Sequence, residues 1–358
     1  MLNRRTFLRT ASGIAASSGA LTVSPRSVFG LSSQSQCPVT ELPLSPEDLK
    51  AYVPVLPSVR AQFFKVDPKI GYAVKEMGGG VYVVSDNGWQ SAFLVTDEGV
   101  IVFDAPQSFG KGIPSAIAKV TDQPVKFLVY SHEHKDHIGG SGAFKGVKNL
   151  TVVATDGVSA FLNSQNDPDR LVPTVVFGDK KTIALGGKTV ELTRHYYHSP
   201  EGDLFIYVPH AKFMMAIDCV TPGYAPFHGF DITENFGEYL NVFDELLAYD
   251  FDTFTGGHLT ATGSKKDVEI TKEFTMDVYH TVKRIHNTMD QAAVVAQAAK
   301  IVGYDNEFLL FKVLLDKVTK CSVAELQPRW INRLAGVDVF LDSHVWTALQ
   351  YVRWDDKS

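Results

Sequence analysis

A cluster of histidines and acids directly after an apolar run constrains this chain more than any other feature. His132, His134 and His137 are three of the chain's eleven histidines, and Asp136 stands among them. The preceding run 125–130 has the composition of a buried strand. His132 and His134 are two residues apart as the chain leaves this strand, so both can face one point, while Asp136 and His137 follow a turn and can face a neighbouring point. This segment can therefore half-build two adjacent metal positions.

The ligand types in this segment favour zinc. Imidazole and carboxylate groups suit that metal, and the absence of cysteine here argues against a closed structural site. Gly139 and Gly140 follow the cluster and allow the backbone to pass close beneath it. We expect a helix to start at these glycines.

Three later residues supply the remaining ligand types. His198 lies in a turn between two predicted strands, and His258 follows the glycine pair 256–257 at the end of another. Asp218 ends the apolar strand 213–217, where an acid needs a partner. Side chains at the ends of successive strands can converge at one rim of a sandwich.

The pattern of apolar runs and turns predicts two sheets between helices. The runs 81–84, 92–95 and 100–103 indicate an antiparallel meander, and a helix near 111–120 leads to the strand 125–130. Further strands are expected at 151–154, 182–185, 189–195, 204–208, 213–217 and 253–255. A helix should bury Phe236, Leu240, Phe243 and Leu247. From about Lys265 the chain is expected to be helical, with the stripe Phe274, Val278, Val282, Ile285 and Met289, and further helices at 307–318 and 341–351.

The ordered set of ligand types resembles the metallo-β-lactamase fold superfamily of metal-dependent hydrolases. The motif His-x-His-x-Asp-His at 132–137 is followed in order by His198, Asp218 and His258, and the resemblance covers roughly residues 77–262. It implies an α/β fold, a four-layer αββα sandwich with a helical C-terminal extension over 263–358. It also implies two Zn²⁺ ions per chain, the first held by His132, His134 and His198, the second by Asp136, His137 and His258, with Asp218 bridging.

The acid at position 218 indicates which branches of the superfamily this chain resembles. An acid fills this place in glyoxalase II-like thioesterases, lactonases and phosphodiesterases, whereas true β-lactamases of this fold usually use Cys or Ser for the second metal. Cys219 is interpreted as a packing residue, with a role as ligand the open alternative. Ile217 stands where Gly is usual, and Tyr197 and Ser199 flank His198 in place of Gly and Thr. We expect these departures to change packing more than ligation.

The resemblance implies a zinc-dependent hydrolase that cleaves a thioester, lactone or other ester-type carbonyl of a small molecule by a hydroxide shared between the metals. Asp136 would orient the hydroxide and receive its proton, and Tyr224 would place its phenol near the developing oxyanion. The alternatives are a mononuclear iron sulfur dioxygenase of the same fold, a β-lactam hydrolase and a non-catalytic binding protein.

Four further residues near the cluster have less specific interpretations. Trp89 is either a substrate platform or a plain hairpin aromatic. Strand alternation predicts that His195 lies at the surface or behind the ligands. The same alternation turns Glu133 and Lys135 away from the metals and into solvent.

The N-terminus resembles a twin-arginine export signal. Residues 3–9 read Asn-Arg-Arg-Thr-Phe-Leu-Arg, and the following stretch 11–23 is too short and too polar for a stable membrane anchor. We therefore expect a signal peptide at 1–30, delivery by the twin-arginine translocation machinery and a periplasmic or secreted location. Residues 31–76 are interpreted as a linker and N-terminal extension. In an oxidising compartment Cys37 could form a disulfide with Cys321.

The charge of the chain argues against a nucleic-acid partner. Its formal net charge is −6, and no run of Lys or Arg is long enough to neutralise a phosphate backbone.

Overall fold

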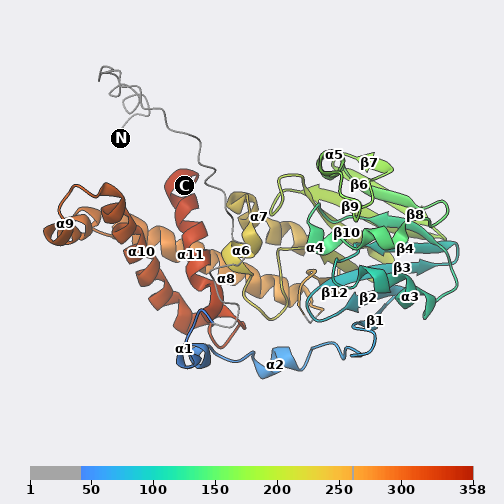
Figure 1. Cartoon of the computed structure of the whole chain (residues 1–358), viewed down its shortest axis with the longest axis horizontal. Coiled ribbons are helices and arrows are strands. Elements are labelled where there is room, and N and C mark those ends of the chain that lie inside the picture. Colours follow the sequence, from blue (N-terminus) through green and yellow to red (C-terminus); the bar gives the residue numbers. More distant parts are fainter. Residues whose placement is uncertain (1–41, 260–261, 358) are drawn as a thin grey trace, which may run out of the picture. The chain divides into compact units, whose positions relative to one another are not determined.

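The computed structural model describes residues 42–259 and 262–357 (Figure 1). The predicted signal peptide and Cys37 lie outside the described residues, so export and the Cys37–Cys321 pairing stay predictions. Internal contacts divide the chain after Leu49, and the fold described below lies in the second unit, which begins at Lys50. Within the described ranges, no helix has both the length and the apolar character needed to cross a bilayer.

The first sheet has seven strands within the described residues, in sequential order. Strands β1 to β4 pair antiparallel, and β4 to β7 pair parallel. The predicted meander is thus correct, while β1 and β7 were not predicted. The strands are β1 (Ala73–Gly78), β2 (Val81–Ser85), β3 (Gln90–Thr96), β4 (Gly99–Phe103), β5 (Val125–Val129), β6 (Thr151–Thr155) and β7 (Val175–Phe177).

The second sheet has five strands in the part of the chain that is described, in the order β12-β11-β10-β9-β8. Neighbouring strands pair antiparallel except β11 and β12, which are parallel. Every strand of this sheet was expected. The strands are β8 (Lys180–Leu185), β9 (Lys188–His195), β10 (Asp203–Val208), β11 (Phe213–Ala216) and β12 (Thr253–Thr255).

Apolar cores hold the layers together. Side chains such as Val83 and Leu94 of the first sheet and Val190 and Ile206 of the second share a fully buried core between the sheets. The outer face of the first sheet packs against α3 (Ile113–Ala118) and α5 (Asp156–Gln165). The outer face of the second packs against α7 (Phe236–Leu247) and the C-terminal helices. The predicted αββα sandwich with a helical C-terminal region is confirmed (Figure 1).

Over residues 262–357 the chain forms four helices, α8 (Lys265–Thr288), α9 (Gln291–Val302), α10 (Glu307–Trp330) and α11 (Val337–Trp354). Helix α8 begins with a capping box between Ser264 and Asp267 and buries the predicted stripe from Phe274 to Ile285. Met289 was expected within the stripe but follows the last helical residue. Helix α9 was not predicted, and α11 begins before Leu341.

The buried face of α7 differs from the predicted one. Phe236 and Phe243 are buried as expected, but Leu240 and Leu247 are only half-buried, and Tyr239, Val242 and Leu246 are buried with the two phenylalanines. The hydroxyl of Tyr239 donates to the Cys219 carbonyl oxygen (2.9 Å) and to Asp231 Oδ2 (3.1 Å). A tyrosine with partners for its hydroxyl can be buried like a phenylalanine, which a purely apolar pattern does not anticipate.

Candidate metal centre

The structure brings all seven predicted metal ligands together at one edge of the sandwich. They form two groups, and within each group the donor atoms lie within 4.8 Å of one another. Each ligand follows a strand or lies in or beside the short helix α4 (Lys135–Ile138), so the two sheets position them. The first group is His132, His134, His198 and Asp218, and the second is Asp136, His137 and His258.

The first group surrounds one point. Nε2 of His132 and Nε2 of His198 both lie 3.3 Å from Asp218 Oδ2. Nε2 of His198 also lies 3.1 Å from His134 Nδ1. Within the described residues, Nε2 of His132 is buried and makes no hydrogen bond. Buried nitrogens that converge on a carboxylate without protein partners fit a cation with nitrogen and oxygen ligands.

The second group lies on the other side of Asp218. Nε2 atoms of His137 and His258 are 3.1 Å apart, and His258 Nε2 lies 2.9 Å from Asp218 Oδ1. Asp136 Oδ2 lies 3.4 Å from His137 Nε2 and 3.7 Å from His258 Nε2. Oδ2 of Asp218 lies near His132 and His198 of the first group and 3.3 Å from His137 Nε2 of the second, while Oδ1 faces His258. The carboxylate thus contacts both groups, as a bridging ligand would.

The protonation equilibria follow from burial and mutual charge. Burial would raise the pKa of Asp218, but His137, His258 and His198 outweigh it and hold the pKa well below its usual range. Burial lowers the pKa of His132 well below its usual value and that of His198 to about 4. Burial would also lower the pKa of His137, but Asp218 reverses this and raises it to about 9. An ionised Asp218 carboxylate beside the neutral imidazoles of His132 and His198 is a donor set that fits a divalent cation.

The two glycines after the motif serve close packing rather than starting a helix. Helix α4 begins before them and ends at Ile138, with Gly139 as its C-cap. A Cβ on Gly140 would clash with the Pro106 carbonyl oxygen, and one on Gly139 would clash with the Lys135 carbonyl oxygen. The expected helix start was therefore wrong, while the expected close backbone approach is present.

Glu133 is buried, contrary to the prediction that it is solvated. The residue is only 3% exposed, and its carboxylate oxygens accept hydrogen bonds from Ser199 Oγ at 2.8 and 2.7 Å. Its Oε1 lies 3.4 Å from Nε2 of His134, the ring nitrogen that does not face His198. Strand alternation failed because β5 already ends at Val129. Lys135 is exposed as predicted and pairs with Asp167 (3.2 Å).

Cys219 lies in the apolar core and not among the candidate ligands. Its Sγ is 3.6 Å from the Ala216 carbonyl oxygen, and the residue is fully buried in the core that contains Phe243 and Phe254. Asp218 adopts a positive φ of 59°, which turns the chain between the acid and the thiol. This placement agrees with the interpretation of Cys219 as a packing residue.

Trp89 makes a contact that the sequence did not reveal. Its Nε1 donates to Asp136 Oδ2 (3.3 Å), and its backbone forms an isolated bridge with His258. Tyr224 lines the same cavity as the ligands. Both residues therefore lie at the candidate site.

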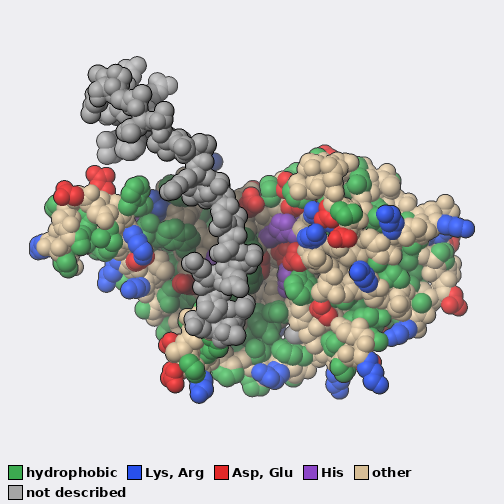
Figure 2. Space-filling model, viewed as in Figure 1, with side chains coloured by type: hydrophobic (Ala, Val, Ile, Leu, Met, Phe, Trp, Pro, Cys, Tyr) green, Lys and Arg blue, Asp and Glu red, His purple; other side chains and the backbone are tan. Residues whose placement is uncertain are grey.

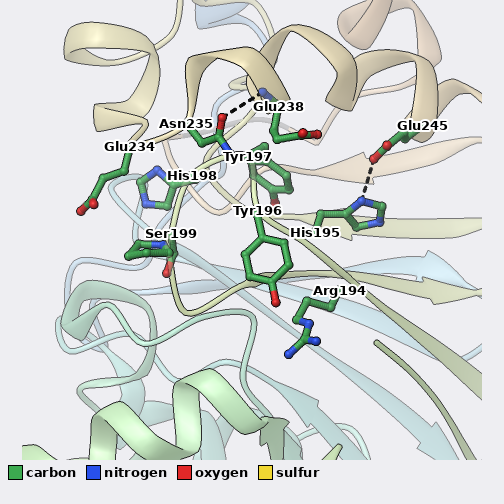
Figure 3. A pocket seen from close by; sticks show the side chains of 11 residues that line it. Arg194, His195, Tyr196, Tyr197, His198, Ser199, Glu234, Asn235, Glu238 and Glu245 are labelled. Carbon is green, nitrogen blue, oxygen red and sulfur yellow. Dashed lines mark hydrogen bonds and ion pairs between the residues drawn. The ribbon is translucent and has the colours of Figure 1, made fainter. Parts of the chain in front are cut away.

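His195 is not part of the ligand cluster. Its Nδ1 lies 2.6 Å from Glu245 Oε2, and its ring stacks on Phe205 with 3.8 Å between the ring centroids. Figure 3 shows the pair of His195 and Glu245 in a separate cavity of about 610 Å³, whose lining includes His198. His195 is half-buried and pairs with Glu245 rather than with a candidate ligand.

Asp203 was overlooked by the sequence reasoning. It starts β10, and its Oδ2 accepts hydrogen bonds from the backbone nitrogens of His198 (2.9 Å) and Ser199 (3.1 Å). This acid fixes the turn that carries His198. A buried acid close after a candidate histidine was the signal that could have found it.

Comparisons with known proteins agree with the fold. Residues 88–258 match the family model described as "Metallo-beta-lactamase superfamily". The chain is 22% identical over 187 residues to the 2,4-dinitroanisole O-demethylase subunit alpha of Nocardioides sp. (strain JS1661), covering 50% of this chain. The chain spans 55% of the length of that relative.

The fold resembles that of a solved structure of low sequence identity. The stereoselective inverting sec-alkylsulfatase Pisa1 from Pseudomonas sp. has a TM-score of 0.56 at 16% identity, over 80% of this chain and 51% of that chain. A metallo-beta-lactamase from Pontibacter korlensis has a TM-score of 0.49 at 17% identity, over 56% of this chain and 97% of that chain. The matched residues 88–258 carry all seven candidate ligands, and members of the metallo-beta-lactamase superfamily are metal-dependent hydrolases.

Proposed function

We propose that this protein is a zinc-dependent hydrolase of a thioester, lactone or other ester-type carbonyl, with two Zn²⁺ ions per chain. The observation that supports this most is the pair of adjacent donor groups with Asp218 between them. His132, His134 and His198 would hold the first ion, Asp136, His137 and His258 the second, and Asp218 both. When bound, such ions polarise a carbonyl and lower the pKa of a water molecule.

The chain's own residues would orient the reactants. Asp136 is fixed by Trp89 Nε1 and lies at the cavity, where its carboxylate can orient the attacking water and accept its proton. Tyr224 lines the cavity and is a candidate to stabilise the developing oxyanion. Glu133 holds His134 from behind and so fixes the ring that faces the first position.

A mononuclear iron sulfur dioxygenase and a β-lactam hydrolase are the alternatives within this fold. A single metal leaves no role for the second group, in which His137 is completely buried and both histidines approach Asp218. Among the described residues the two donor groups include no sulfur, and Cys219 lies in the core. Both observations favour a dinuclear hydrolase with the bridging acid.

Metal content and substrate range test this function together. Protein purified without added chelator should carry about two zinc equivalents per chain and hydrolyse members of a panel of small thioesters, lactones and aryl esters. One iron and no zinc, with oxygen consumption on persulfide substrates, would instead establish the dioxygenase. Hydrolysis of a β-lactam, with none of the other compounds hydrolysed, would show that the protein is a β-lactam hydrolase.

We also propose export through the twin-arginine translocation machinery to the periplasm or medium, on the basis of the motif at residues 3–9. Replacing Arg4 and Arg5 together by Lys should leave a precursor inside the cell. The matched control is Arg9→Lys, which makes the same change beyond the arginine pair and should be delivered normally. Cell fractionation measures both variants, and normal delivery of the double variant would contradict the proposal.

A further inference from the structure

The cavity above the candidate metal centre has a polar floor and apolar walls. Its volume is about 670 Å³, within the range of small-molecule sites. His134, Asp136, His198, Asp218 and His258 lie at its floor. In Figure 2 histidine and acidic side chains are visible in a hollow of the surface with hydrophobic side chains beside it. The walls include Val53, Val55, Trp89, Phe227, Ile232 and Phe340.

The walls of this cavity offer no cation. Asp136, Asp218 and Asp231 line it, and no Lys or Arg occurs among the lining residues that the structure describes. A carboxylate, sulfate or phosphate on the body of a substrate would lose its hydration against these walls without meeting a Lys or Arg. The walls therefore disfavour a negatively charged body and accept an apolar one.

Large apolar side chains at the cavity are exposed in a way that soluble proteins usually avoid. Phe227 is 52% exposed, Ile232 60% and Val339 43%, and all three line the cavity. Phe227 packs edge-on against Phe340, with 4.9 Å between the ring centroids. A contiguous exposed apolar surface around a hollow indicates a binding site for an apolar group.

A strained turn holds part of this wall in place. In α6 (His228–Ile232), Phe230, Asp231 and Ile232 are consecutive non-glycine residues with φ of 61°, 56° and 58°. A non-glycine residue in this left-handed region is strained and keeps the conformation only when its surroundings enforce it. Here Ser343 Oγ accepts from Gly229 N (2.9 Å), and His344 Nδ1 accepts from Phe230 N (3.1 Å).

The acid of this turn is anchored as well. Asp231 Oδ1 accepts from Phe227 N (2.9 Å), and Oδ2 accepts from the hydroxyl of Tyr239. Phe227 and Ile232 lie at the two ends of the turn, so its anchoring fixes two exposed apolar side chains at the cavity. Strain retained at such a place indicates that the wall has a function.

Other walls come from segments outside the matched domain. Val53 and Val55 precede the first sheet, and Val339 and Phe340 belong to α11. The backbone nitrogen of Val53 donates to Asp338 Oδ2 (2.6 Å), which joins the two segments across 285 positions of sequence. The cavity is thus completed by segments on either side of the matched domain.

We propose that the substrate is a neutral compound whose acyl portion is apolar, and that Phe227, Ile232, Val339 and Phe340 select it. This inference rests on the proposed hydrolase function and adds the substrate class. Turnover should therefore rise with the apolar length of the acyl chain and fall when a remote negative charge is added.

Three 4-nitrophenyl esters test the proposal on the zinc-loaded protein: the acetate, the hexanoate and the monoester of adipic acid. The hexanoate is longer than the acetate by several methylenes and lacks the remote carboxylate of the adipate. Since each buried methylene contributes about 0.8 kcal/mol, kcat/KM for the hexanoate should exceed that for the acetate by at least about tenfold. It should exceed that for the adipate monoester by a similar factor, about tenfold, because the carboxylate has no cation to meet.

Two variants locate the effect in the wall. Phe340→Ala should reduce the preference for the hexanoate over the acetate, measured as the ratio of their kcat/KM values, by about tenfold, because the longer chain buries more apolar surface against this ring. Phe308→Ala, at an 89% exposed phenylalanine of α10, is the matched control and should change neither ester. Val339→Lys, at an exposed position, should raise turnover of the adipate monoester by about fivefold and lower that of the hexanoate.

The outcomes separate this inference from the proposed function. If the wild-type protein hydrolyses none of the panel esters, thioesters or lactones, or if Asp218→Ala hydrolyses the acetate equally well, the hydrolase function itself is wrong. If the acetate is hydrolysed in an Asp218-dependent way but all three esters have equal kcat/KM, or the adipate monoester is preferred, the apolar-substrate inference is overturned and the function stands.

Discussion

The floor and the walls of the cavity differ in chemistry and in their origin along the chain. The floor consists of histidines and acids, all within the matched range 88–258 and all at or just after the ends of strands. The walls consist largely of apolar side chains. Many of these come from residues 53–55, from the turn at 227–232 and from α11. Under the proposed function, the reacting groups and the groups that select the substrate therefore lie in different parts of the molecule.

The two regions also differ in how their geometry is maintained. At the floor, charges and hydrogen bonds fix the ligand side chains, as Asp203 does for the turn at His198. At the wall, a left-handed turn is held by hydrogen bonds from its own backbone to Ser343 and His344. Changes at the floor should consequently alter metal content and kcat, and changes at the wall should alter KM and stability with the metals retained.

The largest effect is expected at the centre of the floor. Asp218→Ala removes the acid that is proposed to hold both metals, so metal at the weaker position should be lost and turnover should fall at least about a hundredfold. Cys219→Ala should keep both metals and remain active, because its thiol lies in the core. Elemental analysis and steady-state kinetics of the two variants test this expectation. An active Asp218→Ala beside an inactive, metal-poor Cys219→Ala would show that the Cys219 thiol is the ligand.

A smaller effect is expected behind the ligands. Glu133→Gln weakens the hold on His134 while keeping the shape of the side chain, so metal affinity or kcat should fall by about 10–100-fold. Lys135→Gln, on the same segment and exposed, serves as the control and should behave as the wild type. Competition with a chromophoric chelator measures the affinity. Equal affinity in the wild type and Glu133→Gln would show that Glu133 serves folding alone.

His344, which holds the turn of the wall, should make the unfolding free energy depend on pH. Burial lowers the pKa of His344 from 6.5 to about 3. Between these two pH values the imidazole is protonated in the unfolded chain but neutral in the folded chain. The stability that His344 contributes is complete above the higher value and is lost as the pH falls toward 3, by up to about 1.4 kcal/mol per pH unit. His344→Asn keeps an acceptor for Phe230 N but does not titrate, so its unfolding free energy should depend less on pH in this window.

Urea unfolding of the two proteins at several pH values between about 4.5 and 7 measures the difference, in which effects of metal release cancel. His280→Asn, at an exposed position of α8, is the control and should follow the wild type. Parallel pH profiles for the wild type and His344→Asn would mean that the pKa of His344 is the same in the folded and the unfolded protein.

The smallest expected effect concerns the strain itself. Asn tolerates a positive φ better than a β-branched residue, so Ile232→Asn should raise the unfolding free energy by about 1 kcal/mol. The same change removes an exposed apolar side chain from the wall and should raise KM for the hexanoate ester a few-fold. Ile301→Asn, at an 86% exposed position of α9, should bring neither change. A destabilised Ile232→Asn would show that its side chain stabilises the turn more than the strain costs.

The residues of the cavity floor could be predicted from the sequence because the patterns that indicate them are local. Residue types and spacing at 132–137 indicated a metal site directly, and strand periodicity placed His198, Asp218 and His258 at strand ends. Glu133 was misplaced because alternation was extended beyond the end of β5 at Val129. The run at β1, with its polar Lys75 and Glu76, lacks the apolar character by which its neighbours were recognised.

The walls could not be predicted because their contacts are distant in the sequence. The hydrogen bond between Val53 and Asp338 has no local signature, and neither has the left-handed turn, whose Phe230 and Ile232 disfavour that conformation. Only the packed arrangement of α11 against this turn makes the conformation tenable. Sequence patterns predict what a segment prefers, and here tertiary contacts override that preference.

The hydrogen bond between Val53 and Asp338 has a consequence for engineering. It joins two wall segments that lie outside the matched domain and contain no candidate ligand. A library that varies positions 53–55 and 336–340 can therefore reshape the entrance while every ligand keeps its own supporting contacts. Selection from such a library would redirect the substrate range without rebuilding the reaction centre.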